Sequence, residues 1–221
     1  MILAVEMLVK LVWKDIACTA RKPVEFSGML VFAAAAAVVV AYAALFAGDR
    51  APVYAISLFL VPAFISMFVA FTGFIREFEE GTLDSLRVAP IGGELIFFSK
   101  LFFSFILIGV VTAAYELLVV FFTGGDVSLL NPYLQMLALS YIVYLAATAS
   151  LASSMLVYSS AKSVLVPVVL LVLVLPVGQS YIPLYMDAIA GIVSLQPLLS
   201  IWVVSLGYSL IASALSRTAL F

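Results

Sequence analysis

The charged residues that could do chemistry gather in one short stretch of an otherwise apolar chain. This stretch, residues 76–94, reads REFEEGTLDSLRVAPIGGE and is the densest group of charges in the sequence. Gly81 can end an incoming helix, and Thr82 can cap a new short one. Asp84 suits the positive N-terminal end of such a helix, and Pro90 would stop it. The spacing therefore predicts a short helix between two longer ones.

This predicted helix is amphipathic. Leu83 and Leu86 are three residues apart and share one face, with Arg87 beside them. We expect it to lie parallel to the membrane, where a soluble partner that changes shape on binding ATP could push on it through helix-in-groove docking. The alternative is an ordinary loop at the lipid headgroups. The residues expected to couple to an ATPase subunit are Glu79, Glu80, Gly81, Thr82, Leu83, Asp84, Leu86, Arg87 and Pro90.

Two further ionisable residues fall within one apolar segment. Glu116 lies about two turns before Gly124, and an ionisable residue inside a span is a functional-site hypothesis by default. The alternative is a glutamate near the outer headgroups, held by Tyr115 or by a Ser or Thr hydroxyl. Lys100 lies near the start of the same segment, and we expect its long side chain to reach back to the inner interface rather than to bind substrate.

The other residue types exclude several kinds of chemistry. The chain has no histidine and a single cysteine, Cys18, so it cannot form an intrachain disulfide or a Cys/His metal site. It has no Ser-His-Asp set, no HExxH motif and no phosphate-binding glycine loop of the Walker type. Basic residues do not cluster as a nucleic-acid surface requires. We therefore expect no catalysis here, and ATP hydrolysis in a separate subunit.

The composition predicts an all-α integral membrane protein. Hydrophobic residues make up 66% of the 221 residues and charged residues only 10%, whereas soluble domains are roughly half apolar and about a quarter charged. Segments of about 20 apolar residues can span a bilayer as helices. Six such spans are predicted, at about residues 26–47, 53–75, 96–122, 133–157, 163–177 and 193–215, forming one transmembrane domain over 26–221.

Two regions of this arrangement have distinctive features. Residues 1–25 place Glu6, Lys10 and Lys14 four residues apart among apolar positions, which predicts an amphipathic helix at the interface. A solvated helical leader is the alternative. In the short fifth span, Pro167 and Pro176 predict a kinked or broken helix, which a membrane protein tolerates when neighbours bind the freed carbonyl groups.

The distribution of Lys and Arg predicts the orientation. Cytoplasmic loops carry the excess of basic residues. With six spans and both termini cytoplasmic, nine of the ten basic residues fall on the cytoplasmic side: Lys10, Lys14, Arg21, Lys22, Arg76, Arg87, Lys100, Lys162 and Arg217. Only Arg50 falls outside, where the loops carry Asp49, Asp126 and Asp187. We expect a multi-pass protein of the plasma membrane.

The charged stretch also resembles a known family. The sequence FIREFEEGTLDSLRVAPI at residues 74–91, followed by Phe98-Ser-Lys100, resembles the cytochrome c maturation permease family CcmB (haem exporter protein B), within the ABC-2-type permease superfamily. The shared pattern is an acidic-Gly-Ser/Thr-Leu-acidic stretch, a short run ending in proline and a lysine at the start of the next span. The length and six-span layout resemble that family across the chain, although the Ala/Val-rich first span and the low polarity of the later helices depart from it.

The resemblance implies a function and partners. It implies a permease subunit in cytochrome c maturation, assembled with a cytoplasmic CcmA-like ATPase and with haem-handling CcmC-like and CcmD-like membrane subunits; a homodimer is also compatible with it. Haem would be cargo of the complex rather than a cofactor of this chain, which lacks histidine. The alternatives are an ABC-2 exporter for a drug or lipid, a secondary transporter or channel, and a structural assembly subunit.

Overall fold

The computed structural model describes residues 2–21, 23–88 and 92–220, and every element within these ranges is helical. The elements are α1 Ile2–Arg21, α2 Pro23–Phe46, α3 Ala51–Ala70, a π-helical turn Phe71–Ile75, α4 Arg76–Glu79, α5 Leu83–Val88, α6 Gly93–Phe122, a 3₁₀ turn Val127–Leu130, α7 Pro132–Leu156, α8 Lys162–Val174, a 3₁₀ turn Leu175–Val177, α9 Gly178–Ile189 and α10 Leu195–Leu220. The predicted all-α fold class is confirmed.

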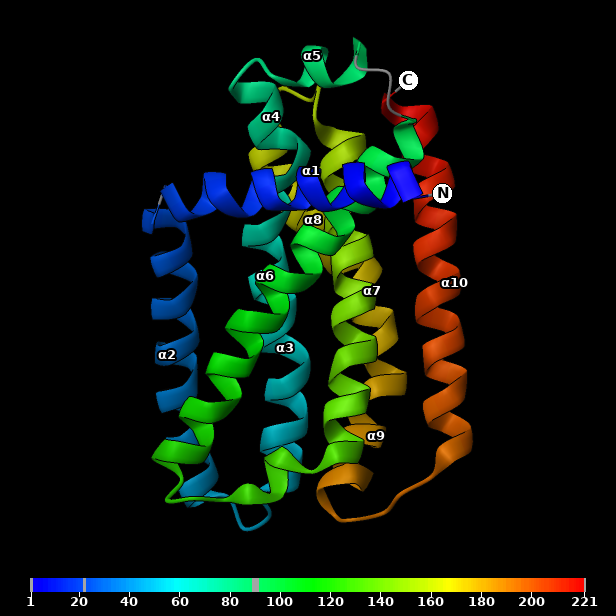
Figure 1. Ribbon diagram of the computed structural model, residues 1–221. Helices are drawn as coiled ribbons and strands as arrows, with labels where there is room; N and C mark the ends of the chain where they lie inside the picture. The colour runs from blue at the N-terminus through cyan, green and yellow to red at the C-terminus, as the bar shows by residue number, and fades with distance from the viewer. Residues whose placement is uncertain (1, 22, 89–91, 221) are drawn as a thin grey trace.

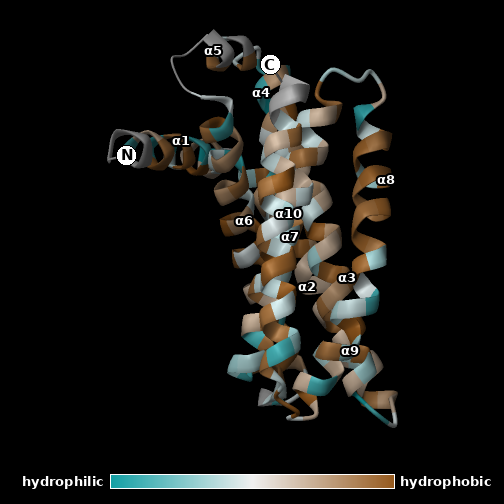
Figure 2. Cartoon of the chain, turned by 90° about the vertical axis from the view of Figure 1, so that its right-hand side faces the viewer, coloured by the Kyte–Doolittle hydropathy of each residue, from teal (hydrophilic) through white to brown (hydrophobic). Residues whose placement is uncertain are grey.

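The described residues contain six helical segments that are long and apolar enough to cross a membrane. They run over Pro23–Phe46, Ala51–Glu79, Gly93–Phe122, Pro132–Leu156, Lys162–Ile189 and Leu195–Ser216. They stand side by side as a bundle whose outward surfaces are largely apolar (Figures 1 and 2). The predicted number of spans is confirmed.

Helix α1 lies across this bundle rather than along it. It runs nearly perpendicular to the spans, at the same end as α5 and the last turns of α10 (Figure 1), and projects sideways from the bundle (Figure 2). This is the position expected of an amphipathic interfacial helix. The helix ends at Arg21 and the first span begins at Pro23, slightly earlier than the predicted residue 26.

The centre of the bundle is α7, the most buried of the six spans. It packs against α10, α6, α3, α8 and α9. The C-terminal half of α7 is rich in Ala and Ser, small residues that let helices approach closely in lipid. In α2, the buried alanines Ala33, Ala37 and Ala41 recur every four residues and so share one face, and α2 packs mainly against α6 and α3.

The second span is interrupted by the π-helical turn Phe71–Ile75. Gly73 has non-helical dihedral angles there, with φ −82° and ψ −119°. Ser153 Oγ of α7 accepts hydrogen bonds from the backbone N–H groups of Phe74 at 3.0 Å and Ile75 at 3.4 Å. A side chain at Gly73 would meet Ser153 Oγ at 3.2 Å, so glycine allows the close approach. The turn lets the helix continue through its charged end to Glu79.

The predicted end of the fifth span is wrong. The predicted range stops at residue 177, but the helix breaks over Leu175–Val177 and continues as α9 to Ile189. The predicted break itself is confirmed, and the Tyr144 hydroxyl of α7 donates to the Leu173 carbonyl at 2.8 Å, two residues before it. A neighbouring helix therefore binds a carbonyl group near the interruption, as the lipid environment requires.

Candidate functional site

Lys100 is buried near the start of α6. Its side chain is 2% exposed. Its Nζ donates to both carboxylate oxygens of Asp15 in α1, each 2.9 Å away, and to Oε1 of Glu77 in α4 at 2.7 Å. The predicted extension of Lys100 to the interface is therefore wrong, because two carboxylates bind all three donor directions of the ammonium group inside the protein.

Lys14 of α1 completes a balanced group of charges. Its Nζ lies 2.6 Å from Glu77 Oε1 and 3.5 Å from Asp15 Oδ1. Burial alone would lower the pKa of Lys14, but the hydrogen bond to Glu77 and the charge of Asp15 outweigh it, and the pKa is raised. Lys14, Asp15, Glu77 and Lys100, hereafter the charge cluster, pair two positive with two negative groups and join three helices.

The segment that leads to α5 is attached to this cluster. Gly81 adopts a positive φ of 70°, and Thr82 N–H bonds to the Glu77 carbonyl at 2.9 Å, which ends α4 in a Schellman-type turn. The predicted helix break at Gly81 is thus confirmed. The Thr82 carbonyl accepts the first bond of α5 from Leu86, while its hydroxyl donates to Glu77 Oε2 at 2.6 Å. The hydroxyl therefore ties α5 to the charge cluster.

Arg76 makes a second connection between α4 and the N-terminal helices. Its guanidinium donates to Thr19 Oγ1 at 3.4 Å and to the Cys18 carbonyl at 3.5 Å, both in α1. It also pairs with Glu25 of α2 at 3.5 Å and with Glu80 at 3.2 Å. The charged end of the second span is therefore held to α1 through Arg76 as well as through Glu77.

The opposite side of α4 contacts the fifth span. Glu79 forms an ion pair of 3.0 Å with Lys162, the first residue of α8. The Lys162 ammonium also lies 4.9 Å from the centre of the Phe78 ring, and Phe78 packs edge-on against Tyr158. A displacement of α4 would therefore reach α8 as well as α1 and α6.

The leucine face of α5 does not point away from the protein. Leu83 is 3% exposed and belongs to the hydrophobic core, and Leu86 is half-buried against the same core. The prediction that these leucines face an ATPase subunit needs correction, because the bundle itself covers them. The exposed positions are Glu79, Glu80, Gly81, Thr82 and Ser85. The side chains of Asp84 and Arg87, and all of Pro90, lie outside the described residues.

Sequence reasoning missed most of the charge cluster. Asp15 and Glu77 are not singled out by the sequence, and Lys14 is noted only for its spacing in the amphipathic helix and as one of the basic residues that predict the orientation. The available signal was that Asp15 stands among apolar and basic residues in a segment expected at the interface, where a lone carboxylate needs a partner. The sequence cannot supply the partner, because Asp15 and Lys100 are 85 positions apart.

Glu116 lies near the other end of α6 and is also buried, at 4% exposure. Its Oε2 accepts a hydrogen bond of 2.8 Å from Gln135 Nε2 of α7, which also donates to the Leu129 carbonyl. The partners named for the alternative, Tyr115 or a Ser or Thr hydroxyl, are therefore replaced by an amide. Within the described part of the chain, Glu116 forms no ion pair with a Lys or Arg side chain.

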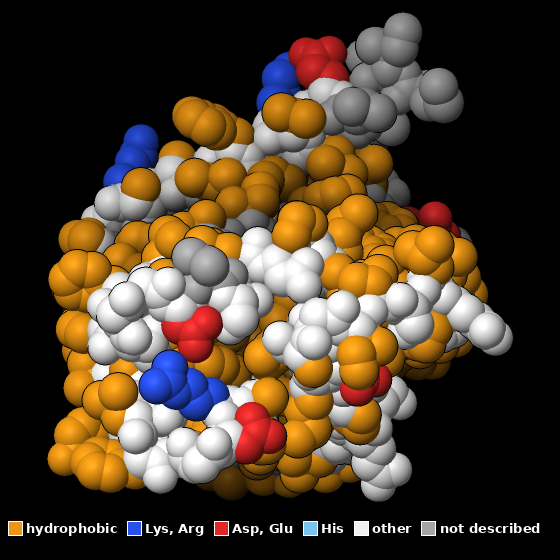
Figure 3. Space-filling view, turned by 90° about the horizontal axis from the view of Figure 1, so that it is seen from below, with side chains coloured by type: hydrophobic (Ala, Val, Ile, Leu, Met, Phe, Trp, Pro, Cys, Tyr) orange, Lys and Arg blue, Asp and Glu red, His pale blue; other side chains and the backbone are white. Residues whose placement is uncertain are grey.

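The end of the bundle opposite α5 is poor in charge. Figure 3 looks onto this end and shows a few charged side chains among many apolar ones. Here Arg50 pairs with Asp126 at 3.7 Å. Hydrogen bonds from Ser128 outweigh partial burial and lower the pKa of Asp126. The charged groups at the α5 end therefore stand apart as an organised site.

The geometry is that of a helical membrane domain with a transverse N-terminal helix and a short helix set on a charged cluster. A family model, ABC-2 family transporter protein, matches residues 9–178. The chain belongs to this family. The matched region includes the whole charge cluster and both residues of the Glu116–Gln135 pair. No curated protein matches the chain. As an ABC-2 family transporter protein, it is a membrane subunit of a system whose ATPase is a partner.

Proposed function

We propose that this ABC-2 family protein is a permease subunit in which α5 and the charge cluster transmit movement from a separate ATPase subunit to the spans. The observation that carries the proposal is Glu77, which binds Lys100 of α6, Lys14 of α1 and Thr82 at the start of α5. A force on α5 therefore acts on two spans, through α4 and α6, and on the transverse helix α1 at once. Removing one partner from a buried ion pair costs free energy. The helices joined by these ion pairs therefore move together.

The surface for the ATPase is the exposed side of this region. The Leu83 face is covered, so we assign docking to the side that carries Glu79, Thr82 and Ser85. We expect Ser85→Arg to weaken ATPase co-purification and substrate-stimulated ATP hydrolysis without reducing membrane insertion. Gly48→Arg, in an exposed loop of the opposite end, is the control. Unchanged co-purification and unchanged stimulation in Ser85→Arg would exclude this docking surface.

The orientation of the spans remains a prediction and has its own test. In a Cys18→Ser background, a cysteine introduced at Asp126 should react with a membrane-impermeant reagent from outside the cell, and one at Ser85 only after the membrane is permeabilised. Both positions lie outside the six spans. The reverse pattern would place α5 on the outer side and remove the docking proposal.

The finer proposal is a role in cytochrome c maturation, by haem export or by release of a haem chaperone. The resemblance of residues 74–100 to the haem exporter protein B family supports it. Without histidine, this chain supplies movement while CcmC-like and CcmD-like partners hold haem. An ABC-2 exporter for a drug or lipid is the alternative.

Deletion of the gene separates these two functions. Loss of covalently attached haem from c-type cytochromes, restored by the wild-type gene, supports the maturation role. Normal cytochromes c in the deletion strain contradict it and favour the general exporter. Neither result affects the family membership. Purified protein titrated with haemin should give no stoichiometric low-spin spectrum, since His ligation is impossible here.

A further inference from the structure

A cavity of about 260 Å³ lies between α6 and α7 and contains Glu116. Two facing stripes form it. On α6, Phe105, Gly109, Thr112 and Glu116 recur every three or four residues, and on α7 the lining residues Gln135, Ala138, Leu139 and Ile142 lie on one face. Small residues make the space: a side chain built on Gly109 would meet no atom within 4 Å.

The polar side chains of this cavity are only partly satisfied by hydrogen bonds. Thr112 is 2% exposed, and its hydroxyl forms no hydrogen bond within the described part of the chain. Glu116 accepts a hydrogen bond at Oε2 from the Gln135 amide and forms no ion pair with a Lys or Arg side chain of the described residues. Buried polar groups are normally satisfied, and a buried carboxylate without a cation is costly. A group that donates hydrogen bonds and carries positive charge would complete both side chains.

The other residues that line the cavity are apolar, and the cavity opens toward the outer surface of the bundle. Ile106, Val110 and Leu139 line the cavity and are 40%, 50% and 40% exposed, on the lipid-facing surface of the bundle. No Lys or Arg is among its lining residues. A phospholipid headgroup would bring a phosphate for which the cavity offers no basic partner. The chemistry fits a single positive group on an apolar body that arrives through the hydrocarbon.

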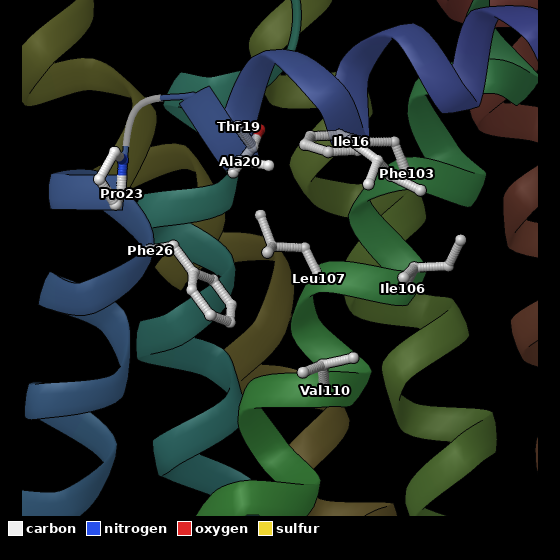
Figure 4. A pocket seen from close by; sticks show the side chains of 9 residues that line it. All are labelled: Ile16, Thr19, Ala20, Pro23, Phe26, Phe103, Ile106, Leu107 and Val110. Atoms are coloured by element: carbon white, nitrogen blue, oxygen red, sulfur yellow. The ribbon is translucent and has the colours of Figure 1, made fainter.

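A second apolar cavity continues along α6 toward α1. Its volume is also about 260 Å³, and it shares Ile106 and Val110 with the first. Figure 4 shows side chains of α1, α2 and α6 converging on the space beneath α1, with Phe26, Leu107 and Ile16 around it. An alkyl chain whose charged end lies at Glu116 can therefore extend along α6 without leaving apolar surroundings.

We propose that this groove binds a lipophilic amine, with the ammonium group at Glu116 and Thr112 and the apolar body against α6. The proposal goes beyond the permease function and the cytochrome role, since it concerns what this chain itself binds. The amine-binding proposal does not depend on where the ATPase subunit docks.

The test measures binding of radiolabelled decylammonium to the purified chain in phosphatidylcholine nanodiscs. We expect saturable binding that unlabelled decylammonium displaces and that decanol, the neutral analogue of the same length, displaces at least about tenfold less well. Glu116→Gln should weaken binding on the order of tenfold or more, because a hydrogen-bonded charge is replaced by an amide. Glu94→Gln, an exposed acid at the start of the same helix, is the control.

A second variant keeps the proposal testable if Glu116→Gln does not fold. Gly109→Leu should fill the cavity and abolish saturable binding while it keeps the helix, since leucine favours helix more than glycine does. Gly28→Leu, at an equally open glycine of α2, should bind as the wild type does. Equal displacement by decanol, or binding unchanged in both Glu116→Gln and Gly109→Leu, would overturn the proposal. Because no ATPase is present, neither result bears on ATP coupling.

Discussion

Helix α6 carries a buried ionisable residue near each of its ends, and the surroundings of the two differ. Lys100 has two carboxylates within 2.9 Å and a further lysine that balances the charge. Glu116, roughly 24 Å further along the helix axis, has an amide at 2.8 Å and an open cavity. A completed group of charges stabilises one conformation, whereas an incomplete one can be completed by a ligand. The comparison therefore separates a structural and mechanical site from a binding site.

The largest effect is expected from breaking the Lys100 site. Lys100→Met leaves Asp15 and Glu77 buried with only Lys14 as a cation, and loss of one partner of a buried pair costs about 3–5 kcal/mol. We expect a large drop in the free energy of unfolding, measured by thermal or denaturant unfolding in detergent, and low accumulation in the membrane. Lys10→Ala, which removes an exposed ion pair with Glu6, should cost no more than about 1 kcal/mol.

A double variant distinguishes charge balance from mere packing. Lys100→Met combined with Asp15→Leu leaves Lys14 paired with Glu77. Because replacement of a buried pair by apolar residues is often close to neutral, the double variant should recover most of the stability that Lys100→Met loses. Additive loss in the double variant would mean that the two side chains act through packing, and the mechanical link argued for Glu77 would weaken.

A smaller effect is expected at the link between the charge cluster and α5. Thr82→Val removes the hydroxyl that donates to Glu77 at 2.6 Å, and hydrogen bonds to charged groups contribute about 1.5–3 kcal/mol. Partial exposure of Thr82 places the expected loss of stability near the lower figure. Substrate-stimulated ATP hydrolysis should fall more than basal hydrolysis. Thr82→Ser keeps the hydroxyl and is the control; an equal loss in both variants would contradict the hydrogen-bond role.

The smallest effect is expected at Glu116 in the absence of a ligand. Glu116→Gln removes no ion pair, and its amide oxygen can still accept from Gln135. We expect the free energy of unfolding of the purified chain to change by less than about 1 kcal/mol, with any change toward greater stability, because an unpaired buried carboxyl group is replaced by a neutral one. If Glu116→Gln lowers the free energy of unfolding as much as Lys100→Met does, the distinction drawn between the two sites is contradicted.

Several features of this protein follow from the sequence by itself. Long apolar segments must be helices across a bilayer, because only helices satisfy every backbone group within one segment. The six spans, the transverse N-terminal helix and the break at Gly81 are local in this sense, since a few neighbouring residues decide each of them. The break in the fifth span is local too, but its end was predicted too early because the turn at Pro176 resembles a terminus and α9 opens with the polar residues Gln179 and Ser180.

Only the tertiary structure decided how the charged residues are used. Lys100 was expected at the interface and is buried, since α1 and α4 bring Asp15 and Glu77 to it from 85 and 23 positions away. Leu83 was expected to face a partner and instead packs in the core. The sequence marks Glu116 as a candidate functional residue within a span, but only the packing of α6 on α7 places Gln135 beside it at the edge of a cavity. Helical spacing fixes which residues share a face, but the neighbour of that face is set by the packing of distant segments.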